Sequence, residues 1–265
     1  MDGAPAVPAW PVAAVRQALA PLLPGLVVQV LPETASTNTE LMERARAGLL
    51  APVLLVAERQ TAGRGRRGRS WESMPGRSLT FSLGLPLAPV DWSGLSLAVG
   101  VGLAESLHPR IGLKWPNDLW LEGRKLAGIL IETAGCGPDQ SASAGSATLR
   151  YAVIGAGLNI AAPGAAGLAT APAWLQELLP GIDAGQALLR LAAPLVRAVQ
   201  AFERSGFAPF LSRFHDRDVL RGTAVALSDG EAGTARGVTA TGALLVHTAG
   251  GMKTVTSAEV SVRPA

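Results

Sequence analysis

The chain has 265 residues and a single cysteine, Cys136. One thiol excludes an intramolecular disulfide framework and is typical of a reducing compartment. Long hydrophobic runs are also few. The longest stretch without a charged residue, 151–176, contains glycines, two prolines and an asparagine, a composition unsuited to a membrane-spanning helix. The first residues lack the basic flank of a secretory signal. These absences predict a globular, cytoplasmic protein with no membrane partner.

Lysine and asparagine are scarce as well. Only three of the 23 basic residues are lysines, and the asparagines are Asn38, Asn117 and Asn159. In a chain rich in Ala, Gly, Arg and Pro, the few that remain are candidates for roles that their substitutes cannot perform. Lys114, Asn117 and Lys125 lie within twelve residues of one another, and this clustering indicates a functional site. The net charge of +3 is too small to require a polyanionic partner.

The order of hydrophobic patterns predicts an α+β protein with a mixed β-sheet flanked by helices and a small β-barrel-like tail. Thr37 and Glu40 have the spacing of a capping box at the start of one helix. We expect strands at 25–31, 52–57, 78–85, 111–115, 119–122, 125–132 and 149–160, and helices at 12–19, 36–48, 93–108, 188–202 and 210–217. Residues 134–147, built from Gly, Ser and Ala, predict a flexible loop. From residue 221 onward short strands replace the helical period. We divide the chain into an N-terminal extension (1–24), a catalytic domain (25–217) and a C-terminal β-domain (218–265).

The segment 63–70 combines three glycines with four arginines. It nearly matches a phosphate-binding loop, but Arg69 occupies the lysine position and a predicted strand follows where such a loop needs a helix. These two differences argue against nucleotide hydrolysis. Three hypotheses remain open for this loop: a solvated basic surface, contact with nucleic acid through the arginines and Trp71, or closure over a small anionic nucleotide.

A second motif spans 114–120 and 124–130. Its Pro-Asn-Asp sequence is good turn chemistry, so a plain hairpin would explain it. However, Lys125 leads directly into the apolar strand 126–131, which fixes its base at the mouth of a core. A charge pair with a carboxylate or phosphate is stronger there than in water. Asp118 is a candidate to ligate magnesium or to orient an incoming amine.

Together these segments resemble the signature segments of biotin–protein ligases. The resemblance is carried, in order, by Ser36-Thr37-Asn38, Gln60, GRGRRGRSW at 63–71, KWPND at 114–118, KLAGIL at 125–130 and GAGLNI at 155–160. It covers about residues 30–216, and the tail resembles the small SH3-like C-terminal domain of that family. The resemblance implies a class II synthetase-like catalytic domain of the biotin/lipoate ligase type.

The resemblance implies a two-step reaction. Biotin and magnesium-bound ATP give biotinyl-5′-adenylate and pyrophosphate, and the adenylate then acylates a lysine of a biotin carboxyl carrier domain. The first step brings two anions together, so it needs cations to cancel their repulsion. An acyl-adenylate is easily hydrolysed, so we expect the loop 63–70 to be mobile without ligand and to close over the intermediate. The resemblance implies ATP and Mg²⁺ as substrate and activator, and no tightly bound metal is expected.

The site residues carry over from the resemblance one by one. The catalytic candidates are Lys125, Arg66, Asp118 and Lys114, with Asp118 also the candidate for Mg²⁺. The biotin contacts are Ser36, Thr37, Asn38, Gln60, Arg64, Gly65, Arg66 and Lys125. The nucleotide contacts are Arg64, Arg66, Arg67, Arg69, Trp71, Asn117, Gly157 and Asn159. Hydroxyl and amide groups suit the ureido head of biotin, although helix capping alone also explains Ser36–Asn38. Gly155 and Gly157 are expected to let the backbone approach the nucleotide.

Two other functions remain open. Lipoate–protein ligases share the superfamily fold and the adenylate chemistry, and a non-enzymatic nucleotide- or RNA-binding module would use the arginine loop alone. Family members that repress transcription carry an N-terminal helix-turn-helix domain. Here only 35 residues precede Ser36, and five of the first 24 are proline, so we expect no DNA partner. Family members differ in whether they dimerise, which leaves a homodimer open.

Overall fold

The computed structural model describes residues 10–136, 148–162, 172–228, 230–256 and 262–264, and within them the chain forms two β-sheets. The larger sheet has seven strands in the order β1-β2-β3-β7-β6-β5-β4. Strands β1 and β2 pair in parallel and all other neighbours are antiparallel, so the sheet is mixed as predicted. Its strands are β1 (Val27–Thr34), β2 (Val53–Gln60), β3 (Ser78–Leu87), β4 (Gly112–Lys114), β5 (Asp118–Leu121), β6 (Arg124–Gly135) and β7 (Arg150–Asn159).

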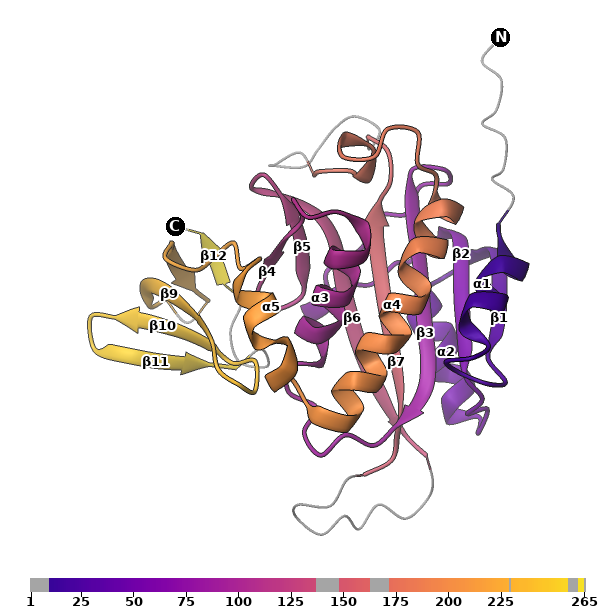
Figure 1. Ribbon diagram of the computed structural model, residues 1–265, viewed down its shortest axis with the longest axis horizontal. Helices are drawn as coiled ribbons and strands as arrows, with labels where there is room; N and C mark the ends of the chain where they lie inside the picture. Colours follow the sequence, from indigo (N-terminus) through magenta and orange to yellow (C-terminus); the bar gives the residue numbers. More distant parts are fainter. Residues whose placement is uncertain (1–9, 137–147, 163–171, 229, 257–261, 265) are drawn as a thin grey trace.

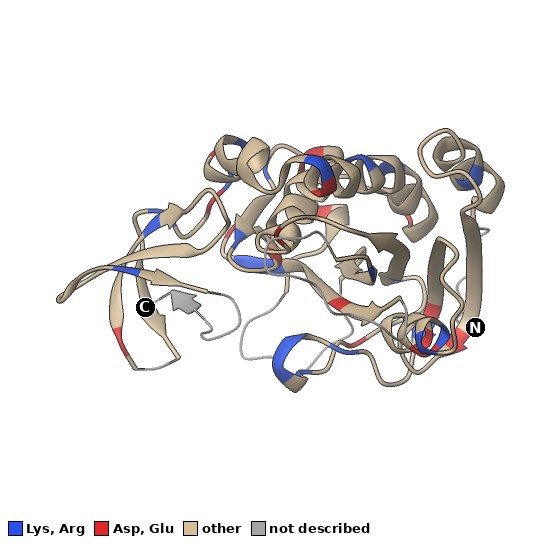
Figure 2. Ribbon diagram, turned by 90° about the horizontal axis from the view of Figure 1, so that it is seen from below, with Lys and Arg blue, Asp and Glu red and all other residues tan. Residues whose placement is uncertain are grey.

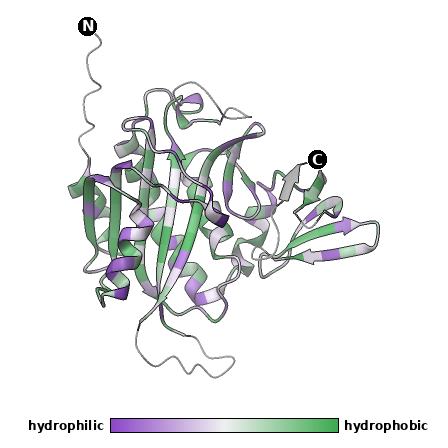
Figure 3. Ribbon diagram, turned by 180° about the vertical axis from the view of Figure 1, so that it is seen from behind, coloured by the Kyte–Doolittle hydropathy of each residue, from purple (hydrophilic) through white to green (hydrophobic). Residues whose placement is uncertain are grey.

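Helices cover the two faces of this sheet unequally (Figure 1). They are α1 (Val12–Leu19), α2 (Thr37–Arg46), α3 (Leu95–Leu107), α4 (Ala184–Ser205) and α5 (Leu211–His215). Helices α1, α3 and α4 lie on one face, over the main hydrophobic core, and α2 lies on the other. A smaller cluster packs beneath α2, around Leu41, Leu55 and Tyr151. The central strands are largely hydrophobic (Figure 3), because both faces are partly covered. Helix α2 covers only part of its face of the sheet (the α2 face). The rest of this face is available for a site.

The second sheet is built from the C-terminal residues, in the order β11-β10-β9-β8-β12, with every pair antiparallel. Its strands are β8 (Ala224–Leu227), β9 (Ala232–Val238), β10 (Leu244–Thr248), β11 (Gly251–Val255) and β12 (Val262–Pro264). It lies beside α3 and α5 rather than over the large sheet (Figure 1). A buried hydrogen bond connects the domains that contain the two sheets. Trp115 Nε1 donates it to the carbonyl of Gly242 at 3.0 Å. The α+β fold with a small separate β-domain is thereby confirmed.

Three details differ from the sequence-based expectations. Helix α2 is capped by Ser36, whose side chain accepts from the Thr39 N–H, so the predicted capping box of Thr37 and Glu40 was wrong by one residue. Helix α4 begins at Ala184 instead of 188, because Asp183 and Gln186 form a reciprocal capping box. Of the loop predicted at 134–147, residues 134 and 135 belong to β6 and residues 137–147 lie outside the described residues.

Positions of basic and acidic residues are interspersed along the ribbon (Figure 2), in keeping with the small net charge. Within the described ranges, no helix combines the length and the hydrophobicity needed to span a bilayer.

Candidate active site

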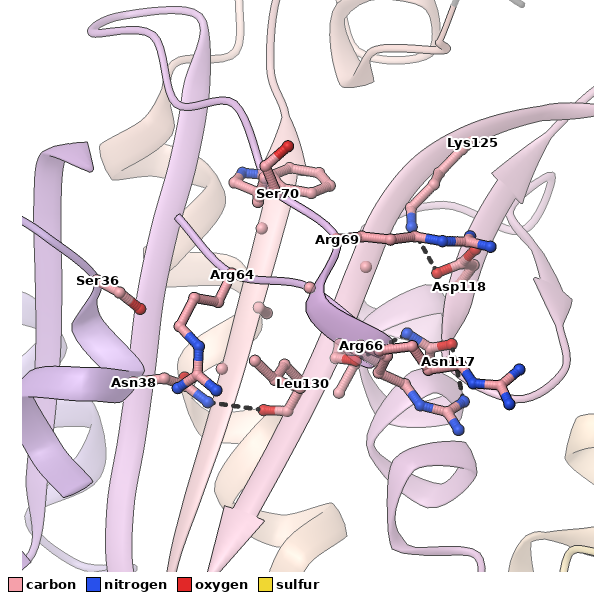
Figure 4. Close-up of a pocket in the computed structure, with 18 of the residues that line it drawn as sticks. Ser36, Asn38, Arg64, Arg66, Arg69, Ser70, Asn117, Asp118, Lys125 and Leu130 are labelled. Carbon is pink, nitrogen blue, oxygen red and sulfur yellow. Dashed lines mark hydrogen bonds and ion pairs between the residues drawn. The ribbon is translucent and has the colours of Figure 1, made fainter. Parts of the chain in front are cut away.

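A cavity opens on the α2 face of the large sheet, between the start of α2, the loop after β2 and the hairpin of β4, β5 and β6 (Figure 4). It brings together the predicted site residues with one exception, Asn159. Those that line it are Ser36, Thr37, Asn38, Gln60, Arg64, Gly65, Arg66, Arg67, Arg69, Trp71, Lys114, Asn117, Asp118, Lys125 and Gly157. The sequence motifs are therefore one site in space, although they are up to 121 residues apart (157 − 36).

The arginine loop is closed on itself by backbone hydrogen bonds. The Gly65 N–H donates to the Arg69 carbonyl at 2.7 Å, and the Trp71 N–H donates to the Gly63 carbonyl at 2.9 Å. A short 3₁₀ turn at Arg66–Gly68 forms its tip, where Arg67 has φ 57° in the left-handed region. A left-handed conformation in a residue with a side chain is strained and is often found at functional sites. No helix follows this loop, which agrees with the argument against a phosphate-binding loop of the hydrolase type.

The charge of the lining is strongly unbalanced. Among the described residues that line it, six are basic and one, Asp118, is acidic. The basic ones are Arg64, Arg66, Arg67, Arg69, Lys114 and Lys125. Burial lowers the pKa of the Arg66 guanidinium, with a further lowering from the neighbouring arginines, and Asp118 opposes both. A cluster of like charges that is partly withdrawn from water gains free energy when an anion binds among them. The cavity is therefore suited to a ligand with several negative charges.

The hairpin places two of its charged groups in contact. Lys125 Nζ lies 2.8 Å from Asp118 Oδ1, and Arg66 donates to the side-chain oxygen of Asn117 at 3.3 Å (Figure 4). The Asn117 amide in turn donates to the backbone carbonyl of Ile129 at 2.9 Å, which holds the turn against β6. Lys114 instead lies over the ring of Trp120, with Nζ 4.8 Å from the ring centroid. These contacts give the cations of the hairpin defined partners before any ligand arrives.

The opposite end of the cavity is neutral and rich in hydrogen-bonding groups. Gln60 Oε1 accepts from the Thr37 N–H at 2.8 Å and lies 3.1 Å from the Thr37 hydroxyl. The Ser82 hydroxyl lies 2.7 Å from both Thr37 Oγ1 and Asn38 Oδ1. Each of these side chains is held by another, so a polar ligand head would meet groups that are already oriented.

The glycines of β7 do something different from what the sequence suggested. A Cβ atom at Gly155 would overlap the side-chain amide of Asn38, and one at Gly157 would lie 2.6 Å from Trp71 Nε1. These positions make room for protein side chains that lie flat on the strand. Close approach of the bare backbone to a nucleotide stays a prediction, since Asn38 and Trp71 occupy this space in the structure.

Asn159 lies outside the lining of the cavity. Its amide donates to the backbone carbonyls of Ala173 at 3.0 Å and Lys125 at 3.5 Å, so it ties the segment after residue 171 to the start of β6. Its contact with a nucleotide stays a prediction.

Sequence reasoning missed two polar residues beside the site. Ser82 of β3 is fully buried and joins Thr37 to Asn38. Glu132 of β6 lies 3.0 Å from Arg64 Nη1 and accepts from the Asn38 amide at 3.0 Å. The available signal for Glu132 was a lone carboxylate directly after the apolar run 126–131 of β6. Nothing local distinguishes Ser82 from other strand serines.

The fold and this cavity define a class of protein: a mixed-sheet enzyme domain whose cation-rich cavity suits a phosphorylated ligand beside a polar head group. Comparison with known proteins makes this specific. Residues 30–159 match the model of the biotin/lipoate A/B protein ligase family, and residues 221–263 match the biotin protein ligase C-terminal domain. The chain belongs to the biotin/lipoate A/B protein ligase family, with the C-terminal domain that is typical of its biotin protein ligases.

Relatives align over most of the chain. A bifunctional ligase/repressor BirA from Escherichia coli is 37% identical over 254 residues, which cover 92% of this chain and 76% of that protein. A biotin–[acetyl-CoA-carboxylase] ligase from Paracoccus denitrificans is 34% identical, with 87% and 98% covered. Among solved structures, the biotin protein ligase of Aquifex aeolicus in complex with biotin and ATP is 27% identical. It superposes with a TM-score of 0.72, over 90% of this chain and 99% of that one.

Proposed function

We propose that the protein is a biotin–protein ligase, which adenylates biotin with ATP and transfers the biotinyl group to a lysine of a biotin carboxyl carrier domain. The observation that carries the proposal is the division of the cavity into a neutral hydrogen-bonding end and a cationic end with one carboxylate. Biotin has the same division, because its cyclic urea is neutral and its valerate carboxylate is charged. Relatives named biotin–[acetyl-CoA-carboxylase] ligase support the same substrate and acceptor.

In the first step a carboxylate oxygen of biotin attacks the α-phosphorus of ATP, the bond from that phosphorus to the bridging oxygen breaks, and pyrophosphate leaves. Negative charge accumulates at the α-phosphate, where fixed cations stabilise it most. Lys125 and Arg66 are our candidates for this role, with Lys114 beside them. Lys125 starts the reaction paired with Asp118, and we infer that it turns to the phosphate when the nucleotide enters. Arg67, Arg69 and Asn117 border the same space, and Trp71 supplies an aromatic face for adenine.

In the second step the acceptor lysine attacks the carbonyl carbon of the adenylate, AMP leaves, and the amine loses a proton. We assign Asp118 to orient that amine, because it is the only carboxylate among the described lining residues. Closure of the loop 63–70 would exclude water until the acceptor arrives. Limited proteolysis with and without biotin plus ATP tests this closure, and equal cleavage rates would count against it.

Magnesium fits this site only as a companion of the nucleotide. Among the described residues, no group of three or more His, Cys, Asp or Glu side chains is placed to hold a metal ion. One carboxylate, Asp118, lies among the cations, and Mg²⁺ is commonly bound by one or two carboxylates together with substrate phosphates and water. Such an ion would neutralise charge on the ATP phosphates.

We place the acceptor in a second cavity, on the other side of the arginine loop. The lining residues that it shares with the first are Arg66, Arg67, Pro116, Ile129 and Leu130, and its further lining residues include Trp92, Thr133 and Arg150. An extended lysine that crosses this shared wall would reach the adenylate without opening the biotin end. We also propose the division of the chain at about residue 218 and, because ATP and carboxylases are intracellular, a cytoplasmic location.

Pyrophosphate release from purified protein with ATP and Mg²⁺ tests the proposal, with biotin or lipoate as the added acid. We expect release with biotin and its loss in Lys125→Ala. Release with lipoate alone would keep the adenylation chemistry and change the substrate. Release with neither acid, from protein shown to be folded, would remove the enzyme function and leave the arginine loop as a nucleic-acid or solvated surface.

A further inference from the structure

A β-bulge at Leu126 brings Lys125 to the cavity side of β6. Lys125 and Ala127 pair with adjacent residues of β5, 120 and 119, so Leu126 is an extra residue that the pairing skips. Side chains alternate between the two faces of a strand, and an extra residue reverses the alternation. Leu126 and Ala127 therefore both lie in the main core, and Lys125 lies among the residues that line the cavity.

Lys125 then lies across the bare backbone of Gly128. A Cβ atom at Gly128 would be 3.1 Å from Lys125 Nζ and 3.2 Å from its Cε. Carbon atoms pack best about 3.5–4.0 Å apart, so even the methyl group of alanine would take space that the end of the lysine uses. The backbone of Gly128 is paired with Asp118 on one side and with Gly157 on the other, so it cannot move aside.

Two further contacts define the position of the ammonium group. Lys125 Nζ lies 2.8 Å from Asp118 Oδ1 (Figure 4) and 5.9 Å from the centroid of the Trp71 ring. Trp71 in turn lies over Gly157, the residue directly opposite Gly128 on β7. The two facing glycines thus form a bare floor on which the lysine and the indole lie side by side.

We propose that Gly128 is a positioning residue, which places the Lys125 ammonium group for the attack of the carboxylate on the α-phosphate. The inference rests on the proposed function, in which Lys125 stabilises the charge of that step. The side chain of Lys125 has a flexible stem and is 42% exposed, so burial alone does not hold it. An ammonium group that lies low on the strand can exchange Asp118 for a phosphate oxygen by rotation of its last bonds. Because it is already in place, little reorganisation is needed when charge develops.

The first test is Gly128→Ala. Gly128 has no positive φ, so alanine fits the backbone, and its methyl group should lift the end of Lys125 by about 0.5 Å. Small misplacements of a catalytic group cost large factors in rate, so we expect kcat for biotin-dependent pyrophosphate release to fall about tenfold. The KM values for biotin and ATP should stay within about twofold, because the affected contact is made in the transition state.

The stability of Gly128→Ala separates positioning from packing. The end of a lysine yields easily and alanine restricts the unfolded chain, so the midpoint of urea unfolding should stay equal or rise. An unchanged kcat would overturn the proposal, and so would a fall in kcat together with a lower midpoint. Gly128→Ser adds the same Cβ atom and replaces Gly128→Ala if that variant does not fold.

Gly100 of α3 offers a matched control. A Cβ atom there would be 3.3 Å from Leu113 Cδ2, close to the distances at Gly128, but Gly100 does not line the cavity. We expect Gly100→Ala to keep the kcat of the unmodified protein. Equal losses of kcat in Gly100→Ala and Gly128→Ala would overturn the proposal, because any added methyl group near this sheet would then have the effect.

The second test observes Lys125 directly, in the full chain without ligand. The chain has three lysines, Lys114, Lys125 and Lys253, so ¹³C labelling at the lysine Cε gives three NMR signals, and Lys125→Arg identifies one of them. The Trp71 ring current should displace the Lys125 signal in the unmodified protein. Gly128→Ala should move this signal toward that of a solvated lysine and leave the other two in place, and an unmoved Lys125 signal would overturn the proposal.

The two tests also separate this inference from the proposed function. Absence of biotin-dependent pyrophosphate release from the unmodified protein would overturn the proposed function, and the inference with it. Equal release from the unmodified protein and from Gly128→Ala would overturn this inference alone.

Discussion

A substitution at Gly157 can distinguish two roles of Trp71, contact with the ligand and packing against the strand. A Cβ atom there would lie 2.6 Å from both Trp71 Nε1 and Cζ2. Carbon atoms pack best about 3.5–4.0 Å apart, so the indole must retreat by roughly 1 Å in Gly157→Ala. The backbone of β7 cannot yield instead, because the strand is paired on both sides. Gly157 has no positive φ, so alanine adds only this overlap.

Two magnitudes follow. Overpacking destabilises the folded protein by about 1–3 kcal/mol. Alanine also restricts the unfolded chain, which stabilises the folded protein by about 0.4–1 kcal/mol, so we expect the free energy of unfolding to fall by about 1–2 kcal/mol. Stacking of a base on an aromatic ring is worth about 1–3 kcal/mol, and a displaced ring keeps part of it. A rise of about tenfold in the KM for ATP, measured by biotin-dependent pyrophosphate release, is therefore expected for Gly157→Ala.

Gly84 of β3 offers a matched control. A Cβ atom there would lie 2.9 Å from two ring carbons of Tyr151, which packs beneath α2 and does not line the cavity. Gly84→Ala should lose a similar free energy of unfolding in urea and keep the KM for ATP. A Gly157→Ala variant with reduced stability and an unchanged KM would refute the reasoning and leave Trp71 as a packing residue. An equal rise of the KM in both variants would do so as well.

Four further predictions concern the rest of the molecule. Asp118→Asn should slow transfer from preformed adenylate about tenfold or more and leave pyrophosphate release intact, and unchanged transfer would remove its assigned role. Trp92→Ala should raise the KM for the carrier domain severalfold with no effect on adenylation, so equal effects on both steps would argue against the second cavity as the docking site. Trp115→Phe leaves the buried Gly242 carbonyl unpaired, so the free energy of unfolding in urea should fall by about 1–3 kcal/mol. An unchanged unfolding midpoint would show that the bond is dispensable. Burial raises the pKa of Asp218, so its charged form destabilises the fold above that pKa. Asp218→Asn should therefore stabilise the protein at pH 7, a gain that vanishes below about pH 4.

The sequence predicted the elements of the sheet well because their signals are local. Apolar strands such as β2 and β6 end at glycines or turns, and the motif residues near their ends, apart from Asn159, lie around one cavity. The start of α2 shows where local patterns fail. Ser36 and Thr37 both have the side chain of a helix cap, and the choice is made from outside, because Gln60 takes the Thr37 N–H from 23 residues away.

The same limit explains the residues that were missed or displaced. Asn159 was assigned to the nucleotide from the family resemblance, and in the structure its amide donates to backbone carbonyls 14 and 34 residues away. Glu132 and Ser82 acquire a role only when β6 and β3 are brought beside the start of α2. Periodicity shows which face of a strand a residue occupies, and it does not show which side chain will lie across from it.

The two glycines of β7 explain how this site is kept rigid. Because Gly155 and Gly157 have no side chains, Asn38 and Trp71 lie directly on the strand, where each is held by backbone on one side. A ligand in the cavity then meets oriented side chains that cannot fall back into the sheet, and little conformational freedom is lost when it binds. Glycine in this strand therefore favours binding by orienting the contacts, whereas the sequence alone suggested that it admits the ligand to the backbone.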